Sequence, residues 1–421
     1  MAKISVPYGK STQEAVISDQ IELQVIDVQK APITVPPEQM LRTAMDHPIG
    51  CARLETMVKP EDQVLIVVND HTRPGPYAIM VQEIVSRLES AGVKDDHIRF
   101  IVATGSHRAD TREEVAQTIG AAFLDRYQVI MHDCKDPDSI VSIGMTRSGL
   151  PLYVNKAVVE STFIITTGLI APHHAAGYSG GRKSILPGVA GLETLKIHHS
   201  LPIRPFEPAM GFIEGNPFHE ASLEAAKKVN VRFIINAVQD PHKQNIAFVT
   251  GDVEAAHAIG VAACKKVSEI EIRGLGDIVI TSPGGYPRDC NLYQAQKALS
   301  VAEVLGKPGC VFILCAQAGD GIGEGVFREW MVEAKTPQEV VERFKREGYN
   351  VGSNKAFMVA RALTKGRVIV VSEYLKEKDL NEMMLEWAPD LQTAIDKASG
   401  AKAPGKIIVL PRAVNMIPRL V

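Results

Sequence analysis

A run of five apolar residues, Val64–Val68, leads directly into a polar loop and then into a segment with helical periodicity. A continuous apolar run is typical of a parallel strand that is buried on both faces. The loop reads Asp-His-Thr-Arg-Pro-Gly-Pro over 70–76, and apolar residues at helical spacing predict a helix over 77–91. This order of strand, polar loop and helix strongly limits the folds that are open to the chain.

The same order returns at Ile98–Val102. The loop Ala-Thr-Gly-Ser-His-Arg follows over 103–108, and Thr111 with Glu114 forms a capping-box pattern for the next helix. Strands that alternate with helices predict an α/β fold with mainly parallel, Rossmann-like sheets. Ligands bind such sheets beyond the carboxyl ends of the strands, where these loops fall.

With 421 residues, the chain is long enough for two domains. Residues 1–35 are expected to form short strands, and residues 268–276 resemble a linker. We therefore expect an N-terminal α/β domain over residues 1–270 and a C-terminal α/β domain over residues 271–421. The second domain would close a cleft that holds the active site. Other apolar runs predict further strands, at 233–238, 246–249, 277–281, 311–314, 368–372 and 406–410.

The stretch from Gly168 to Ser200 concentrates residues that can do chemistry. It follows the expected strand Phe163–Ile165 and contains two histidine pairs, a glycine pair and a lysine, namely His173, His174, Gly180, Gly181, Lys183, His198 and His199. Glycines permit close backbone approach and can direct amides at an anion. The lysine could bind phosphate or form a covalent bond, and the histidines could bind a metal or move protons.

A plainer reading is a loop beside a helix whose histidines are solvated or bonded to backbone. The stretch is not a Walker loop, because the spacing of that motif is absent. Asp70, Arg73, His107 and Arg108 also stand at strand ends. Taken one at a time, a helix-cap or surface-charge role explains each of them better. Together they indicate a shared site.

A second group comes from the expected C-terminal domain. Tyr293 and Lys297 are four residues apart and share a helix face, with Gln294 adjoining it. This trio could reach a cleft, although its spacing alone favours a solvated helix face.

Composition excludes several classes of protein. The net charge of −3 gives no electrostatic reason to expect nucleic acid or an anionic membrane. No apolar run reaches the ~20 residues that span a bilayer, and the first residues do not resemble a signal peptide. The six cysteines lack C-x-x-C spacing, which argues against a zinc knuckle or a disulfide scaffold. We expect a cytoplasmic protein.

Four motifs together resemble the nickel-dependent lactate racemase family over nearly the whole chain. They are DHTRP at 70–74, GSHR at 105–108, PHHAAGYSGGRKSILPG at 172–188 and YQAQK at 293–297. The third is the most specific. The resemblance implies an isomerase that uses a nickel-pincer nucleotide (nickel pyridinium-3,5-bisthiocarboxylic acid mononucleotide), which separate biosynthetic enzymes supply.

Carried over motif by motif, the resemblance implies a role for each site residue. Lys183 would link covalently to the cofactor, and His199 would ligate nickel. His107 and His173 would be the paired acid and base. The remaining assignments are Asp70, Thr72, Gly180 and Gly181 beside the cofactor, and Arg73, Tyr293, Gln294, Lys297 and Phe357 beside the substrate. Phe357 is preferred over Trp330 and Trp387 as the aromatic contact, and His174 and His198 receive no role.

The implied reaction is racemisation or epimerisation of lactate or a related 2-hydroxy acid. It would proceed by reversible hydride transfer through a 2-keto acid, which avoids a poorly stabilised carbanion. One alternative is a zinc hydrolase that uses the histidine cluster, although no H-E-x-x-H pair is present. The other is a nickel or nucleotide carrier without catalysis, which would not explain His107 and Arg73.

Overall fold

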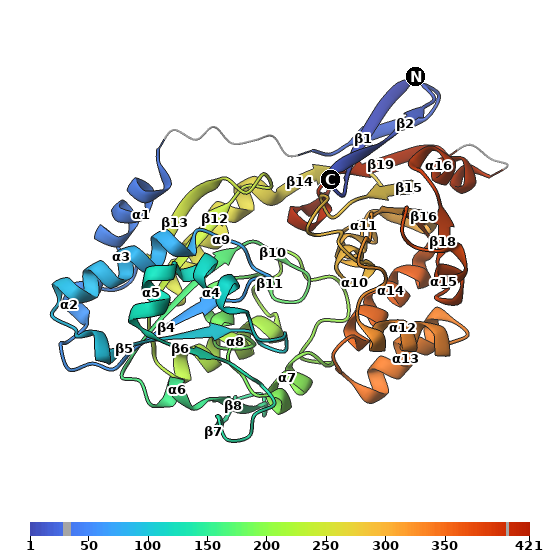
Figure 1. Cartoon of the computed structure of the whole chain (residues 1–421). Helices are drawn as coiled ribbons and strands as arrows, with labels where there is room; N and C mark the ends of the chain where they lie inside the picture. Colours follow the sequence, from blue (N-terminus) through green and yellow to red (C-terminus); the bar gives the residue numbers. More distant parts are fainter. Residues whose placement is uncertain (28–34, 401–403) are drawn as a thin grey trace. The chain divides into compact units, whose positions relative to one another are not determined.

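The computed structural model describes residues 1–27, 35–400 and 404–421, and the chain divides into two compact units (Figure 1). The central unit comprises residues 30–267. The terminal unit combines residues 1–29 with residues 268–421. Both units have mixed α/β structure with mainly parallel sheets, as the sequence predicts.

The central unit is built on a six-stranded sheet in the order β13-β12-β9-β4-β5-β6. Only β13 runs antiparallel to its neighbour. The strands are β4 (Val64–Asn69), β5 (Ile98–Ala103), β6 (Gln128–Met131), β9 (Phe163–Ile170), β12 (Val231–Gln239) and β13 (Asn245–Gly251). The apolar run that predicted a doubly buried strand is therefore the core of β4, with β5 and β9 on its two sides.

Both faces of this sheet are covered. Val64, Ile66 and Val68 of β4 pack against the helices of one face, and Leu65 and Val67 against those of the other. The first face carries α1 (Pro37–Asp46), α2 (Leu54–Met57), α3 (Tyr77–Ser90) and α4 (Arg112–Ile119). The second carries α6 (Lys156–Val159), α7 (Leu192–His198) and α8 (Pro217–Lys228). Strand β4 thus lies at the centre of a three-layer unit.

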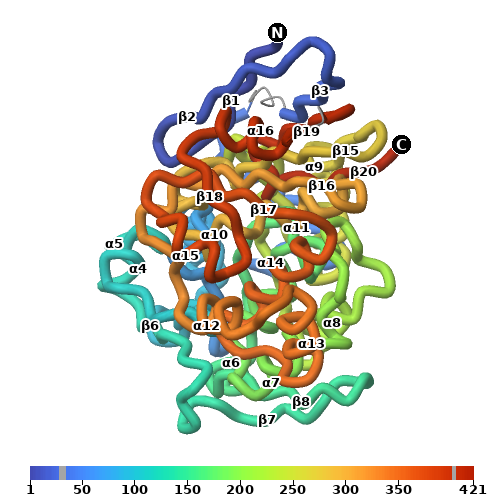
Figure 2. Tube along the Cα trace, turned by 90° about the vertical axis from the view of Figure 1, so that its right-hand side faces the viewer, coloured from blue at the N-terminus to red at the C-terminus, as the bar shows by residue number. Residues whose placement is uncertain are grey.

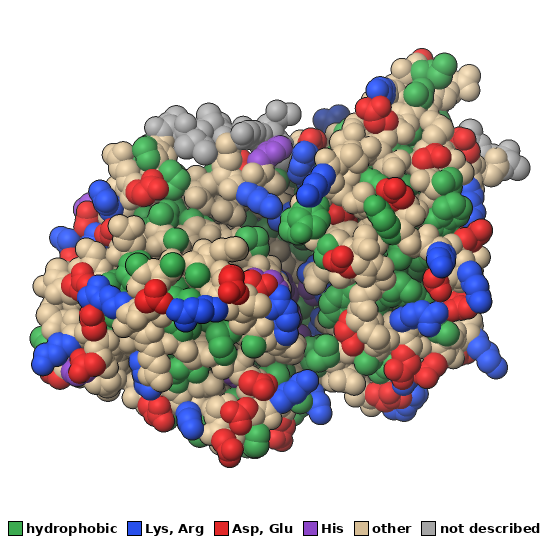
Figure 3. All heavy atoms as spheres, in the orientation of Figure 1, with side chains coloured by type: hydrophobic (Ala, Val, Ile, Leu, Met, Phe, Trp, Pro, Cys, Tyr) green, Lys and Arg blue, Asp and Glu red, His purple; other side chains and the backbone are tan. Residues whose placement is uncertain are grey.

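The remaining elements of the central unit are short or peripheral. They are η1 (Asp95–His97), α5 (Ala121–Arg126), the β7–β8 hairpin (Ile140–Met145 and Pro151–Asn155), β10 (Pro172–His173), β11 (Gly177–Tyr178), η2 (Gly181–Ser184) and α9 (Ala255–Ser268). The predicted capping box of α4 is confirmed, because Thr111 and Glu114 bond to each other's backbone amides. Basic and acidic side chains are interspersed on the face of this unit seen in Figure 3.

The terminal unit has a second six-stranded sheet, entirely parallel, in the order β18-β17-β16-β15-β19-β3. Its strands are β3 (Glu22–Val25), β15 (Gly276–Thr281), β16 (Gly306–Cys315), β17 (Gly366–Val371), β18 (Glu386–Ala388) and β19 (Lys406–Leu410). The predicted strands at 277–281, 311–314, 368–372 and 406–410 are all found here.

Helices and two small sheets complete the terminal unit. The helices are α10 (Leu292–Ala295), η3 (Gln296–Ala298), α11 (Leu299–Ala302), α12 (Gly325–Glu333), α13 (Pro337–Glu347), α14 (Ser353–Lys365), α15 (Glu377–Glu382), α16 (Leu391–Ser399) and η4 (Ala413–Asn415). The small sheets pair β1 (Ala2–Tyr8) with β2 (Ser11–Ile17) and β14 (Glu269–Ile272) with β20 (Ile417–Leu420). None of the described helices is long and apolar enough to cross a membrane.

The division into units differs from the expected domain of residues 1–270 at its beginning. Strand β3 pairs in parallel with β19, near the other end of the chain. The β1–β2 hairpin packs its apolar face, which includes Ile4 and Val6, into the core of the terminal unit beside α16 (Figure 2). Residues 1–29 therefore belong with residues 268–421, because their strand partner and apolar contacts lie there. Residues 28–34, part of the expected N-terminal strands, lie outside the described residues.

Candidate active site

Three polar loops meet at one edge of the central sheet. Strand β4 pairs in parallel with both β5 and β9, so the loops that follow these three strands leave the same edge side by side. They are the loops after Asn69, Ala103 and Ile170. The prediction that the three motif loops stand at neighbouring strand ends is confirmed.

Asp70 and His107 form the first group of side chains in these loops. Asp70 is 3% exposed, and its Oδ2 lies 2.6 Å from Nδ1 of His107. Thr72 donates its hydroxyl to Oδ1 of Asp70 at 2.8 Å, and Arg73 donates to the hydroxyl oxygen of Thr72 at 3.0 Å. The sequence-predicted residues Asp70, Thr72, Arg73 and His107 therefore form one connected chain of hydrogen bonds.

This chain sets the ionisation of Asp70. Burial alone would raise the pKa of its carboxyl group. The hydrogen bond from His107, the charges of His107 and Arg73, and the hydrogen bond from Thr72 together outweigh burial and hold that pKa below its usual value. Asp70 is thus a carboxylate that accepts the Nδ1 proton of His107. The ring then keeps its lone pair at Nε2, where it can act as a base.

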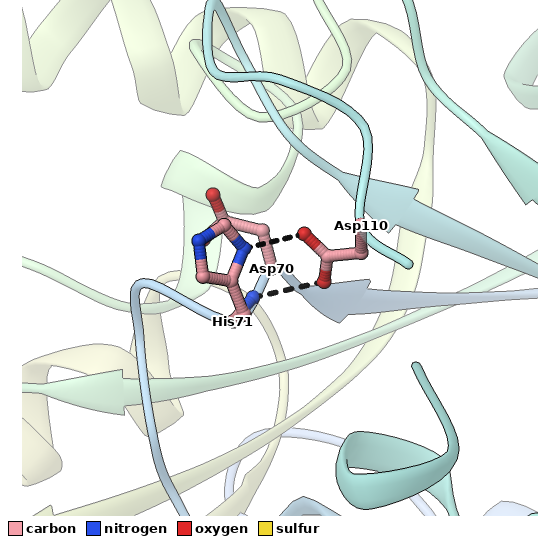
Figure 4. A group of neighbouring side chains, drawn as sticks. All are labelled: Asp70, His71 and Asp110. Carbon is pink, nitrogen blue, oxygen red and sulfur yellow. Dashed lines mark hydrogen bonds and ion pairs between the residues drawn. The ribbon is translucent and has the colours of Figure 1, made fainter. Parts of the chain in front are cut away.

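A second histidine–aspartate pair lies beside the first, and the sequence analysis did not single it out. Asp110 accepts from Nδ1 of His71 at 2.6 Å and from the His71 backbone amide at 2.9 Å (Figure 4). Arg108 contacts Nε2 of His71 at 3.3 Å and is itself paired with Glu114. These bonds tie the loop after β4 to the loop after β5.

Asp70, His71 and Asp110 also place their ligand atoms within 4.8 Å of one another, as a metal site would. Nδ1 of His71 is already bonded to Asp110, and the Asp70 carboxylate to His107 and Thr72. The side chains of this group therefore already have hydrogen-bond partners within the protein. It differs from the cluster of motif histidines on which the zinc hydrolase alternative was based.

Lys183 and His173 form the next group, in the loop after β9. Lys183 lies in η2, and its Nζ is 2.8 Å from Nε2 of His173. On the other side of the ring, Nδ1 of His173 accepts from the backbone amides of Ala175 at 3.2 Å and Ala176 at 3.1 Å. The local turn therefore fixes the orientation of this imidazole.

The ring of Phe218 lies near Lys183 and the second histidine pair. No motif in the sequence indicated this residue. It lies in the first turn of α8, where the side chain of Asn216 caps the helix. The Phe218 ring centroid is 5.8 Å from Nζ of Lys183 and 5.1 Å from the ring centroid of His199. Lys183 and His199, which are sixteen positions apart in sequence, thus approach the same aromatic ring.

His199 is held as a neutral imidazole with a defined tautomer. It stands at the carboxyl end of α7, and its Nδ1 donates to the carbonyl of Leu195 at 3.1 Å. Burial is the main cause that lowers its pKa well below the usual value. The lone pair therefore resides at Nε2, the form of histidine that ligates metals.

The two histidines without assigned roles have packing functions. His198 is fully buried, and its ring centroid lies 3.7 Å from that of Phe218. Its Nε2 lies 3.1 Å from the Phe218 carbonyl, and burial lowers its pKa to about 3. His174 stacks on His173 with ring centroids 4.5 Å apart. One histidine of each pair thus supports the other.

Contacts with Asn236 explain why the fold has glycine at position 180 and how it uses the amide of Gly181. Gly180 has φ +82°, and a Cβ at that position would lie 2.5 Å from Oδ1 of Asn236. The Gly181 amide donates to the same oxygen at 3.0 Å. That amide is therefore used inside the protein, and the place of Gly180 and Gly181 beside the cofactor stays a prediction.

Arg182 also holds the loop after β9 in place through hydrogen bonds. It is fully buried and donates to the carbonyls of Ala176 at 3.0 Å and Tyr178 at 2.9 Å. Its guanidinium also lies 2.6 Å from Nε2 of His257 on α9. These bonds fix the backbone of the segment that follows His173.

The remaining predicted residues lie in the terminal unit. Tyr293 and Gln294 are in α10 and Lys297 in η3, with Gln294 accepting from the ammonium of Lys297. Lys355 lies over the Tyr293 ring, 5.7 Å from its centroid. Tyr293, Gln294 and Lys297 therefore form a local cluster, and their contact with substrate stays a prediction.

Phe357 is a buried residue of the terminal unit. Its ring is fully buried in α14 and stacks on Phe344 with centroids 4.6 Å apart. Arg361 covers it at 5.4 Å and pairs with the buried Glu303. These contacts give the ring a packing role, and its contact with substrate stays a prediction.

Comparisons with known proteins agree with this geometry. The family model for the lactate racemase N-terminal domain matches residues 8–211, and that for the lactate racemase C-terminal domain matches residues 273–418. A lactate racemase from Thermoanaerobacterium thermosaccharolyticum is 34% identical over 429 residues and is covered completely, as is this chain. A lactate racemase from Lactiplantibacillus plantarum is 33% identical, with 99% of this chain and 100% of the relative covered.

The fold agrees as well. The structure of the lactate racemase apoprotein from T. thermosaccharolyticum superposes with a TM-score of 0.92 at 31% identity, covering 99% of this chain and all of the other. A Thermotoga maritima protein shares the fold with a TM-score of 0.64 at 17% identity, over 86% of this chain and 94% of its own.

Proposed function

The chain belongs to the lactate racemase family, a family of isomerases, and from this premise we propose that it racemises lactate or a related 2-hydroxy acid with a nickel-pincer nucleotide as cofactor. The observation that carries the proposal is the group around Phe218. There an imidazole nitrogen suited to a soft metal and a lysine amine approach one aromatic ring.

The residues present fit this cofactor. Nε2 of His199 holds the lone pair that nickel ligation requires, because Nδ1 gives its proton to Leu195. The amine of Lys183 would form the covalent link. When bound, the cofactor would supply a hydride acceptor, so that the substrate passes through a planar 2-keto acid.

The protein must then move the hydroxyl proton of the substrate. Asp70 leaves the lone pair of His107 at Nε2, whereas the two amides on Nδ1 of His173 leave the hydrogen of that ring at Nε2. One histidine would thus be ready to take a proton and the other to give one. General base help of this kind contributes roughly 10²–10⁴-fold to a rate. An acid and a base on two loops would let either enantiomer react.

The substrate carboxylate needs a cation that holds the keto acid in place. Arg73 is oriented by Thr72, which in turn is bonded to the buried Asp70. We assign the carboxylate to Arg73, with Tyr293, Gln294 and Lys297 as further contacts from the terminal unit. A planar guanidinium suits this task because it can donate two parallel hydrogen bonds.

The test is production of the protein together with the enzymes that make the cofactor, followed by intact mass and nickel content. We expect a mass increment and about one nickel per chain in the wild type. Lys183→Ala should lose the increment, and His199→Ala should lose nickel. Lys196→Ala, an exposed position on α7, is the matched control and should retain both.

A panel of 2-hydroxy acids follows, beginning with the two lactate enantiomers and continuing to longer and more acidic acids. Racemisation that depends on His107 and His173 supports the proposal. A loaded protein that turns over none of them would favour the carrier alternative. Activity in protein that holds neither nickel nor increment would overturn the cofactor assignment.

A further inference from the structure

The contact between Lys183 and His173 constrains where protons can reside. Nε2 of His173 lies 2.8 Å from Nζ of Lys183, a hydrogen-bond distance. Nδ1 of the same ring receives two backbone N–H groups, from Ala175 and Ala176. A nitrogen that accepts hydrogen bonds carries no proton, so the single proton of the neutral imidazole is at Nε2.

That proton faces the lysine. An ammonium group can only donate, and it would need a lone pair at Nε2. A lone pair at both ring nitrogens would make His173 an imidazolate, which is not a stable form at neutral pH. The hydrogen bond is satisfied when Nε2–H donates to an uncharged amine. The geometry therefore selects the neutral form of Lys183.

A neighbouring positive charge also disfavours the ammonium form of a lysine. Arg182 is its chain neighbour and is fully buried. His198 and His199 on α7 interact electrostatically with Lys183, and burial keeps both histidines neutral. Arg204 is the further cation acting on His199. The nearby Phe218 ring and the partial burial of Lys183 both reduce the hydration that an ammonium group requires.

We propose that His173 holds Lys183 as an uncharged nucleophile and so prepares it for attachment of the cofactor, a role that precedes any part His173 takes in turnover. The proposal rests on the proposed function for the identity of the cofactor. The activated amine itself is a property of the protein before loading. An ordinary lysine, with a pKa near 10.4, is only about 0.1% neutral at pH 7.4 and would react slowly.

Attachment would be a condensation that joins Lys183 to one arm of the cofactor and releases water. Nζ of Lys183 attacks the carbon of a thiocarboxylic acid arm, and a C–N bond forms. The C–O bond of that carbon breaks, since the sulfur is kept as a metal ligand. The proton at Nε2 of His173 passes to the leaving oxygen, which departs as water, and a proton from the amine replaces it on the ring. The product is a thioamide, and no oxidant or reductant is consumed.

The test uses the purified full chain without cofactor. Acetic anhydride at trace concentration labels amines at a series of pH values, and peptide mass spectrometry reads each lysine separately. The labelling rate of Lys183 is divided by its own plateau at high pH, which removes the effect of partial burial. Lys94, an exposed lysine of the central unit, is the internal reference.

At pH 7.4 we expect the normalised rate of Lys183 to exceed that of Lys94 by about 100-fold, as for an amine held largely neutral. In His173→Gln, whose amide oxygen can accept from an ammonium, the excess should fall at least tenfold. His173→Ala is the second variant, and circular dichroism checks that both are folded. Equal normalised rates for Lys183 and Lys94 in the wild type, or an excess that survives both substitutions, would overturn the inference.

The labelling test of Lys183 can fail independently of the test of the proposed function. A fast-labelling Lys183 in a protein that never acquires the mass increment would retain the activated amine and remove the cofactor link. A slow-labelling Lys183 that still acquires the increment would retain the cofactor link and overturn the activated amine. In co-production, His173→Gln should also accumulate the increment more slowly than the wild type while His199 is intact.

Discussion

Asp70→Asn tests the most sharply defined hydrogen bond of the candidate site. The substitution keeps the size of the side chain but removes the negative charge 2.6 Å from Nδ1 of His107. A hydrogen bond to a charged group contributes about 1.5–3 kcal/mol, and 1.36 kcal/mol corresponds to a factor of ten in rate. The His107 side chain is 42% exposed, so solvent screens part of this interaction. We expect the rate of lactate racemisation to fall about 10- to 50-fold.

The assay is the conversion of one lactate enantiomer into the other by cofactor-loaded protein, with the rate divided by nickel content. Asp110→Asn is the matched control, because Asp110 contacts His71 at the same distance in the neighbouring loop. It should change the rate less than about threefold, which is about half of the 1.36 kcal/mol that a tenfold change requires. A loaded Asp70→Asn protein that keeps the wild-type rate would refute the reasoning. So would an Asp110→Asn protein that is equally impaired at an unchanged melting temperature.

Two further predictions concern stability. His132 is 2% exposed, and burial lowers its pKa to about 4. Because the unfolded chain then binds more protons than the folded one below pH 6.5, the contribution of His132 to stability is complete above pH 6.5 and falls by about 3 kcal/mol as the pH drops to 4. Urea unfolding across this range should show the loss in the wild type and less of it in His132→Gln; identical pH dependences would contradict the assignment. Gly180→Ala should destabilise the protein by about 2–4 kcal/mol, since it adds a steric clash to a left-handed backbone. Gly149→Ala, with φ +83° and open space around its Cβ, carries only the backbone strain and should cost about 1 kcal/mol; equal costs would show that the contact with Asn236 is unimportant.

Much of the fold could be predicted because it depends on local patterns. Apolar runs such as Val64–Val68 mark strands that are buried on both faces, and the polar residues after them mark the edge where ligands bind. Residues 1–29 were misplaced because the partner of β3 lies at the far end of the chain, and no local pattern records such a pairing. The role of Phe357 is not fixed by its sequence position either, because periodicity does not distinguish a buried ring that faces a core from one that faces a ligand.

The motif residues of the site were found from sequence, whereas the groups that position them were not. Asp110 and Phe218 have no distinctive spacing, and their importance comes from hydrogen bonds and ring contacts made across loops. His71 stands inside a motif that was recognised, yet its partner Asp110 is 39 positions away in a different loop. An aspartate at the end of a polar loop that precedes a helix cap is the one signal that could have suggested Asp110.

The two histidine pairs show how backbone groups can assign different chemistry to the same side chain. Nδ1 of His199 meets a carbonyl, so its lone pair is at Nε2 and suits a metal. Nδ1 of His173 meets two amides, so its hydrogen is at Nε2 and suits a proton donor. An exchange of roles between the two would require either ring to lose its backbone partner, at a cost of about 1–3 kcal/mol for each buried group left unsatisfied. The turn after β10 and the last turn of α7 thus decide which histidine can ligate nickel and which can move a proton.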